Sequence, residues 1–263
     1  MLIKVLINSL ILIALVGGQI AWLSVELRAD VVKEITVSAA ISLKNALTEI
    51  GELFQQSHPG AKVSFNFGAS GDLMAQIKAG APVDIFVSAA LKDMDQLEGE
   101  GLIISGSRQN IATNEVVLIQ PVNTSCPISS FEDLPRAEIN KIAVGNPKSV
   151  PAGRYAAEVF QYFQLGEPLK DKLILAENVR QVLDYVARGE VEAGVVYRTD
   201  AMTKAKEVKV VAAAPEQSHK PVVYPVGVVK GSKNENAARE FIAAVVSAEG
   251  KAVLKKYGFG VGP

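Results

Sequence analysis

The hydrophobic residues of this chain fall into short runs, each followed by a stretch with apolar positions at helical spacing. The runs at residues 35–39, 63–67 and 141–144 predict strands, and each leads through a short turn into a helix. The first of these helices is strongly amphipathic, with its apolar face formed by Leu43, Ala46, Leu47, Ile50, Leu53 and Phe54. Small or hydroxyl residues stand at the helix starts, so the three units predict one site built from several turns.

The turn at residues 68–71 reads Gly-Ala-Ser-Gly and shows what such a site could bind. Ser70 is expected to be the N-cap of the helix that follows, and the glycines on either side allow a tight turn and a close approach to a ligand. The start of a helix presents unpaired N–H groups and a partial positive charge, which suit an anion. Most serine caps bind only their own helix, so the indication comes from the repeated unit rather than from this turn.

The rest of the chain continues to alternate between strands and helices. Predicted strands at 83–88, 115–120, 193–197 and 208–211 are separated by predicted helices, and two more helices close the chain at 236–246 and 248–257. This order predicts an α/β fold with parallel-type sheets covered by helices on both faces. Asp84 interrupts the apolar run at 83–88, and we expect it to have a structural hydrogen-bonding role, because a carboxylate would repel an anion.

Two extended stretches, 115–121 and 222–229, are interpreted as crossings between two lobes. The Pro-, Ser- and Thr-rich residues 121–134 also suggest a passage between lobes. The predicted division is a signal peptide at 1–29, a first lobe of 30–114 plus 225–263, and a second lobe of 115–224.

The charge balance and the N-terminus limit the class of protein. The chain has 27 basic and 28 acidic residues, a net charge of −1, which argues against a nucleic-acid partner. Residues 5–16 are mostly apolar, and Leu27-Arg28-Ala29 is a suitable cleavage site, so we expect export by a signal peptide removed before Asp30. An uncleaved membrane anchor is the alternative. No cysteine stands near this end, so a lipid anchor is not expected.

Six motifs, at residues 36–43, 68–71, 80–84, 144–153, 194–197 and 256–259, together resemble the periplasmic molybdate-binding proteins of bacterial ABC transporters. The resemblance extends from Ile35 over nearly the whole remaining chain. It implies a type II periplasmic binding-protein fold, with two lobes, each a mostly parallel sheet flanked by helices, and the ligand in the cleft. It also implies a periplasmic location, a membrane permease as partner, a monomer, and no catalytic activity.

The resemblance also implies a set of ligand-binding residues: Ser42, Ser70, Ala152, Val179 and Tyr197. Hydroxyls would come from Ser42, Ser70 and Tyr197, and backbone N–H groups from all of these residues except Tyr197. The ligands would be molybdate or tungstate, which have the same charge and nearly the same size. Molybdenum would enter only as the bound oxyanion, with no further metal or cofactor.

Two alternatives remain open from the sequence. One is a binder of another tetrahedral oxyanion, such as sulfate or phosphate. The other is a hydrolase on the same fold with Ser42 or Ser70 as nucleophile, which would need a general base within reach, and no His, Lys or Glu stands beside either serine in its motif. Lys148, Arg154 and Arg180 lie near the proposed site in sequence, and we expect them to be solvated at its rim. The predicted site therefore holds its anion with neutral donors only.

Overall fold

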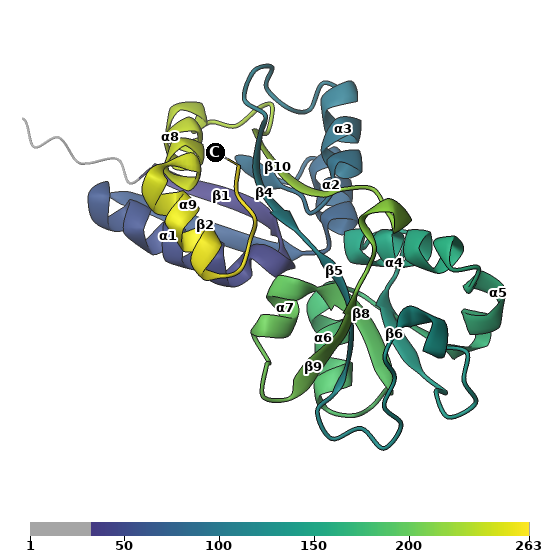
Figure 1. The fold of residues 1–263 in the computed structure, drawn as a ribbon. Helices are drawn as coiled ribbons and strands as arrows, with labels where there is room; N and C mark the ends of the chain where they lie inside the picture. Colours follow the sequence, from purple (N-terminus) through teal and green to yellow (C-terminus); the bar gives the residue numbers. More distant parts are fainter. Residues whose placement is uncertain (1–32, 263) are drawn as a thin grey trace, which may run out of the picture. The chain divides into compact units, whose positions relative to one another are not determined.

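The computed structural model describes residues 33–262, which contain two five-stranded sheets with helices packed against them (Figure 1). The first sheet has the order β2-β1-β3-β10-β4 and consists of β1 (Lys33–Ala40), β2 (Ala61–Gly68), β3 (Ile85–Val87), β4 (Gln109–Asn114) and β10 (Val222–Val228). The second has the order β7-β6-β8-β5-β9 and consists of β5 (Val116–Pro121), β6 (Ile142–Gly145), β7 (Leu173–Ala176), β8 (Ala193–Tyr197) and β9 (Val208–Ala213). The predicted signal peptide at 1–29 lies outside the described residues.

Both sheets are mixed and have the same arrangement. In the first sheet β1 is parallel to β2 and β3, whereas β10 is antiparallel to β3 and β4. In the second sheet β6 is parallel to β7 and β8, whereas β5 is antiparallel to β8 and β9. The predicted α/β class with mostly parallel sheets is confirmed, because in each sheet one strand, β10 or β5, runs against the other four. The antiparallel strands are those next to the two points where the chain changes sheets.

The first sheet is covered on both faces, because the three successive residues of β3 are all apolar and buried while their side chains point to alternate faces. Ile85 and Val87 pack in the large hydrophobic cluster with α1 (Lys44–Ser57) and α8 (Glu235–Val246), and α9 (Ala248–Lys256) packs on these two helices. Phe86 points the other way, into a smaller cluster with α2 (Ser70–Lys78) and α3 (Leu91–Gly99). Successive side chains of a strand point to opposite faces, so one continuous apolar run serves two layers.

The second sheet is covered by α4 (Pro151–Tyr162), α6 (Val179–Ala187) and α7 (Arg198–Met202). A Cβ on Gly194 of β8 would lie 2.6 Å from a methyl of Val186, so a glycine is needed there for α6 to pack this closely. The remaining helical segments are short: α5 (Gly166–Leu169), η1 (Ile41–Leu43), η2 (Phe131–Asp133), η3 (Lys170–Lys172) and η4 (Glu216–Ser218). Among the described residues, no helix is both long and apolar enough to cross a membrane.

Three features differ from the sequence-based expectations or refine them. Strand β4 was not predicted, because in its sequence Gln-Asn-Ile-Ala-Thr-Asn only Ile111 and Ala112 are buried apolar residues. The predicted passage between lobes at 121–134 is wrong, since these residues join β5 to β6 within the second sheet. Strand β10 pairs in the first sheet from Val222 onward, so the return to that sheet runs through residues 214–221. The lobe boundaries stay a prediction.

The structural role expected of Asp84 is confirmed. One of its carboxylate oxygens accepts a hydrogen bond from the backbone N–H of Thr36 at 2.8 Å, and the other accepts one from the hydroxyl of Ser232 at 2.5 Å. The side-chain amide of Asn234 lies 3.4 Å from it. This buried acid therefore ties β1 to the loop after β10, away from the turns of the predicted site.

Candidate functional site

The five residues predicted to bind the ligand line one small cavity. Ser42 lies in η1 just after β1, and Ser70 is the first residue of α2 just after β2, so both come from the first sheet. Ala152 in the first turn of α4, Val179 at the start of α6 and Tyr197 at the end of β8 come from the second. The space between them, open side included, is about 210 Å³. The turns are thus brought together as the repeated unit predicted, while the ligand-binding roles stay a prediction.

The cavity is neutral, and helical segments begin at its wall. None of the described residues that line it carries a charged side chain: they are Ala40, Ile41, Ser42, Gly68, Ala69, Ser70, Ala89, Val150, Pro151, Ala152, Val179 and Tyr197. The segments η1, α2, α4 and α6 all start there. The N–H groups of a first turn have no helical carbonyl to bond and carry the positive end of the helix dipole. The site is therefore suited to an anion without a counter-ion.

The predicted capping role of Ser70 is wrong. The N-cap of α2 is Ala69, and Ser70 is already helical. Its hydroxyl oxygen instead accepts a hydrogen bond from the backbone N–H of Ala89, at 3.0 Å, in the loop after β3. A hydroxyl that accepts this bond keeps its own hydrogen available. Ser70 is fully buried at the cavity wall, so that hydrogen can be donated to a ligand.

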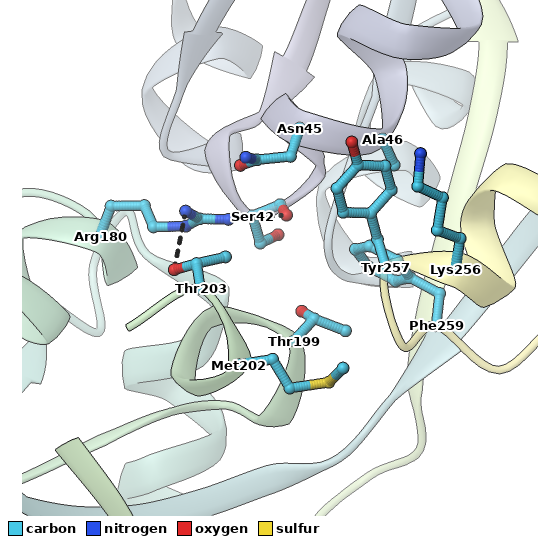
Figure 2. Close-up of a pocket in the computed structure, with 10 residues that line it drawn as sticks. All are labelled: Ser42, Asn45, Ala46, Arg180, Thr199, Met202, Thr203, Lys256, Tyr257 and Phe259. Carbon is cyan, nitrogen blue, oxygen red and sulfur yellow. Dashed lines mark hydrogen bonds between the residues drawn. The ribbon is translucent and has the colours of Figure 1, made fainter. Parts of the chain in front are cut away.

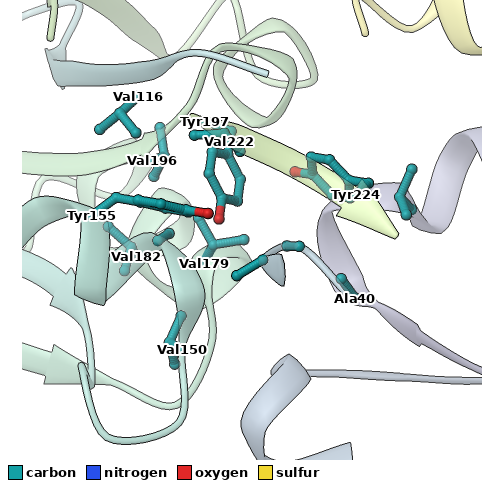
Figure 3. Close-up of a cluster of buried hydrophobic side chains, with 14 of the residues drawn as sticks. Ala40, Val116, Val150, Tyr155, Val179, Val182, Val196, Tyr197, Val222 and Tyr224 are labelled. Carbon is teal, nitrogen blue, oxygen red and sulfur yellow. The ribbon is translucent and has the colours of Figure 1, made fainter. Parts of the chain in front are cut away.

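Tyr197 brings a buried hydroxyl that has no partner within the described part of the chain. The residue is 1% exposed, and its hydroxyl oxygen makes no hydrogen bond there. Figure 3 shows this hydroxyl directed toward the space beside Val179. Burial raises the pKa of Tyr197 well above its usual value, so the group is a neutral donor at physiological pH. An unpaired buried hydroxyl costs about 1–3 kcal/mol, which a bound acceptor would recover.

The two arginines near the site are not solvated, contrary to expectation. Arg154 of α4 pairs with Asp93 of α3 at 2.5 Å, and Arg180 of α6 pairs with Asp200 of α7 at 2.5 Å. The arginine side chains are 15% and 19% exposed, and the two carboxylates are almost completely buried. Each buried carboxylate needs a cation, and this holds the arginine in place. Lys148 is exposed, as expected.

A second, larger pocket, about 630 Å³ with its open side included, also has Ser42 in its lining (Figure 2). Its lining includes Asn45, Arg180, Thr203 and Tyr257. A guanidinium nitrogen of Arg180 lies 3.5 Å from the backbone oxygen of Ser42, and another donates to the hydroxyl of Thr203 at 3.3 Å. Arg180 therefore contacts the backbone of Ser42 rather than its hydroxyl, and its charge is already paired with Asp200.

Elements of the two sheets meet directly beside the cavity. The backbone N–H of Gly71 donates to the carbonyl of Ser149, at 2.9 Å, between the start of α2 and the loop before α4. The Asp93–Arg154 pair joins α3 to α4. Sequence reasoning singled out Gly71 only as a turn residue and did not consider Asp93, because only the folded chain shows that each contacts an element of the opposite sheet.

The serines lack the partners that a nucleophile requires. The hydroxyl of Ser42 bonds that of Tyr224 at 3.1 Å, and the hydroxyl of Ser70 bonds the backbone of Ala89. No His, Lys or Glu side chain is hydrogen-bonded to either serine in the described region. The geometry thus provides donors for a bound ligand and no activated nucleophile.

Comparisons with known proteins agree with this geometry. Residues 35–260 match the family model described as bacterial extracellular solute-binding protein. The chain is 42% identical to the "Putative ABC transporter substrate-binding lipoprotein YvgL" of Bacillus subtilis, over 86% of this chain and 85% of that protein. It is 38% identical to the molybdate-binding protein ModA of Haemophilus influenzae, over 86% and 89%. The solved periplasmic molybdate-binding protein of Azotobacter vinelandii shares the fold, with a TM-score of 0.78, 23% identity and coverage of 87% and 100%.

Proposed function

This chain belongs to the bacterial extracellular solute-binding protein family, and we propose that it captures molybdate or tungstate and delivers it to the permease of an ABC transporter. The family consists of binding proteins rather than enzymes. The ligand is held between the two sheets by Ser42, Ser70, Ala152, Val179 and Tyr197. The exported protein acts as a monomer in the periplasm after loss of residues 1–29.

One observation carries this proposal: the neutral cavity collects donors from five separate segments, and one of them, the Tyr197 hydroxyl, is buried without a partner in the described part of the chain. A fully ionised tetrahedral dianion has acceptors on every corner and no hydrogen to donate. Hydroxyls and first-turn N–H groups can bond all of these acceptors without a fixed counter-charge. The wall offers few acceptors in return, so a protonated anion would leave its own hydrogen unpaired.

Selection among dianions then depends on the size of the cavity. Sulfate is smaller than molybdate and tungstate, and donors fixed on two packed sheets cannot all close around it. The donors come from elements of both sheets, so a change in the distance between the sheets opens the cavity or closes it around a ligand. We propose that they act as two lobes that close over the ligand by a hinge at the two crossings.

The test is a calorimetric titration of the purified protein with molybdate, tungstate, sulfate and phosphate. We expect tight binding of the first two and much weaker binding of the others. Equal affinity for sulfate would contradict selection by size, and the absence of binding by any oxyanion would refute the proposed function. A matched titration of Tyr197→Phe reports whether the ligand occupies this cavity, since that change removes one donor and leaves the ring.

A further inference from the structure

The hydroxyl of Ser42 belongs to a chain of hydrogen bonds, buried at Tyr224 and partly buried at Asn114, whose other members do not line the cavity. The hydroxyl of Tyr224, on β10, lies 3.1 Å from the hydroxyl of Ser42 and 3.2 Å from the side-chain nitrogen of Asn114, at the end of β4. Tyr224 is fully buried, and its ring contacts that of Tyr197 edge to face, with centroids 6.0 Å apart. Figure 3 shows its hydroxyl pointing toward Tyr197 rather than out of the protein.

The surroundings of Asn114 determine which group donates at each step. Its side-chain oxygen accepts the backbone N–H of Glu115 at 2.9 Å, which fixes the orientation of the amide. The side-chain nitrogen then faces the hydroxyls of Tyr224 and Thr199, at 3.2 and 2.8 Å. An amide nitrogen can only donate, so the oxygen of Tyr224 accepts from it.

The direction of the remaining bonds follows. With its oxygen engaged by Asn114, the Tyr224 hydroxyl donates its hydrogen to Ser42. Ser42 accepts that bond, and its own hydrogen is left for the cavity. Burial also raises the pKa of Tyr224 far above its usual value, so the tyrosine keeps its proton at any physiological pH.

We propose that Asn114 and Tyr224 are positioning residues of the anion site, which orient the hydroxyl hydrogen of Ser42 into the cavity. The inference rests on the proposed function, since it assigns these two residues a part in holding the same oxyanion. Neither residue lines the cavity, and both stand on the strands next to the crossings between the sheets. Without them the Ser42 hydroxyl is free to rotate and to donate elsewhere, and binding must then select the productive rotamer.

The decisive experiment is a double-mutant cycle with molybdate as the probe, read by titration calorimetry. Tyr224→Phe should weaken molybdate binding about tenfold, the effect of about 1.4 kcal/mol on a hydrogen bond to a charged group. In the Ser42→Ala background, which has no hydroxyl to orient, the same change should have almost no further effect. Tyr155→Phe is the matched control, because Tyr155 is also a buried tyrosine in contact with Tyr197 but does not bond Ser42. It should change the affinity less than threefold.

The cycle separates positioning from a general structural role. If Tyr224→Phe weakens binding equally with and without the Ser42 hydroxyl, Tyr224 acts through the packing of the site, and the inference is wrong. If Tyr224→Phe keeps the wild-type affinity, the inference is wrong as well, although the proposed function stands. If the wild-type protein binds no oxyanion, the proposed function itself has failed. Urea unfolding of each ligand-free variant confirms that folded protein was titrated.

A second variant tests the direction of the chain of bonds. Asn114→Asp replaces the donor nitrogen by a carboxylate oxygen, which can only accept. Tyr224 should then donate to the new carboxylate, and Ser42 should turn its hydrogen toward Tyr224 and away from the cavity. We expect a larger loss of affinity than for Tyr224→Phe. The part of this loss that comes from charge repulsion should persist in the Ser42→Ala background, whereas the part that comes from reorientation should vanish; a loss of equal size in both backgrounds would contradict the proposed direction.

Discussion

Gly71 offers the sharpest test of the idea that the sheets close over a ligand. It is the second residue of α2, it is not among the residues with positive φ, and its N–H bonds the carbonyl of Ser149 in the loop before α4. A Cβ added at Gly71 would lie 2.6 Å from that carbonyl oxygen and 2.8 Å from the Cα of Ser149. The methyl group would therefore strike backbone atoms of the opposite sheet, which cannot rotate away.

The magnitude follows from this geometry. Ordinary contact begins near 3.4 Å, so the two backbones would have to separate by about 0.8 Å, which lengthens the Gly71–Ser149 hydrogen bond. Overpacking costs about 1–3 kcal/mol and the bond about 1 kcal/mol. Gly71→Ala should thus weaken molybdate binding by about 2–4 kcal/mol, roughly 30- to 1000-fold. If the ligand-free protein is open, its stability should stay the same or rise by about 0.4–1 kcal/mol, because alanine suits a helix better than glycine.

Titration calorimetry gives the first quantity, and urea unfolding without ligand gives the second. Gly99→Ala is the matched control, since Gly99 also lies in a helix of the first sheet's layers and a Cβ there meets no atom within 4 Å. It should leave the affinity unchanged. Wild-type affinity in Gly71→Ala would refute the reasoning about closure. A ligand-free variant destabilised by about 2–4 kcal/mol with unchanged affinity would show that the sheets are in contact before the ligand arrives, because the clash would then cost the free and the bound state alike.

Three further outcomes follow from the contacts of single residues. Ser70→Ala should cost about 1.5–3 kcal/mol in molybdate affinity by calorimetry, the range for a hydrogen bond to a charged group, and a smaller loss would mean that the serine does not donate to the anion. Arg154→Leu should lower stability in urea unfolding by about 3–5 kcal/mol because it leaves the buried Asp93 unpaired, and Arg154→Leu with Asp93→Leu should restore most of that loss; a double variant as unstable as the single one would contradict the pairing. Burial raises the pKa of Tyr155 above its usual value of 10, so the folded state favours the neutral phenol. The contribution of such a tyrosine to the free energy of unfolding should be fully present below pH 10 and fall by about 1.4 kcal/mol per pH unit above it. When the free energy of unfolding is measured in urea from pH 9 to 11, Tyr155→Phe should make its fall with pH less steep.

Much of the fold was predictable because buried helices and strands place apolar residues at regular spacings in the sequence. Strand β8 was predicted to the residue, since all five of its residues are buried, and the apolar face predicted for α1 contains the buried residues Ala46, Leu47, Ile50 and Phe54. Strand β4 was missed because it is largely polar and lies at the edge of its sheet, where few positions face the core. Polar edge strands leave no hydrophobic pattern to detect.

The site was only partly accessible to the same reasoning. Ser42 and Ser70 could be suspected from their hydroxyl groups. Ala152 and Val179 would bind the ligand through backbone N–H groups, and the identity of a side chain does not reveal a backbone donor. Resemblance to a family supplied these two. Asn114 and Tyr224 were missed for another reason: they are separated by 110 residues in sequence, and only the pairing of β4 with β10 brings them together.

The arrangement of charges beside the cavity gives a physical basis for the selectivity that we propose for a site without cations. Two arginines lie close to the donors, but Arg154 is paired with Asp93 and Arg180 with Asp200, so each cation is cancelled by a buried acid on a neighbouring helix. An unpaired arginine would attract any anion, because Coulomb attraction depends weakly on the shape of its partner. Hydrogen bonds depend steeply on distance and angle. Without net charge on the wall, recognition of the proposed oxyanion would depend on the positions of the N–H and O–H groups, and these positions are set by the packing of the two sheets.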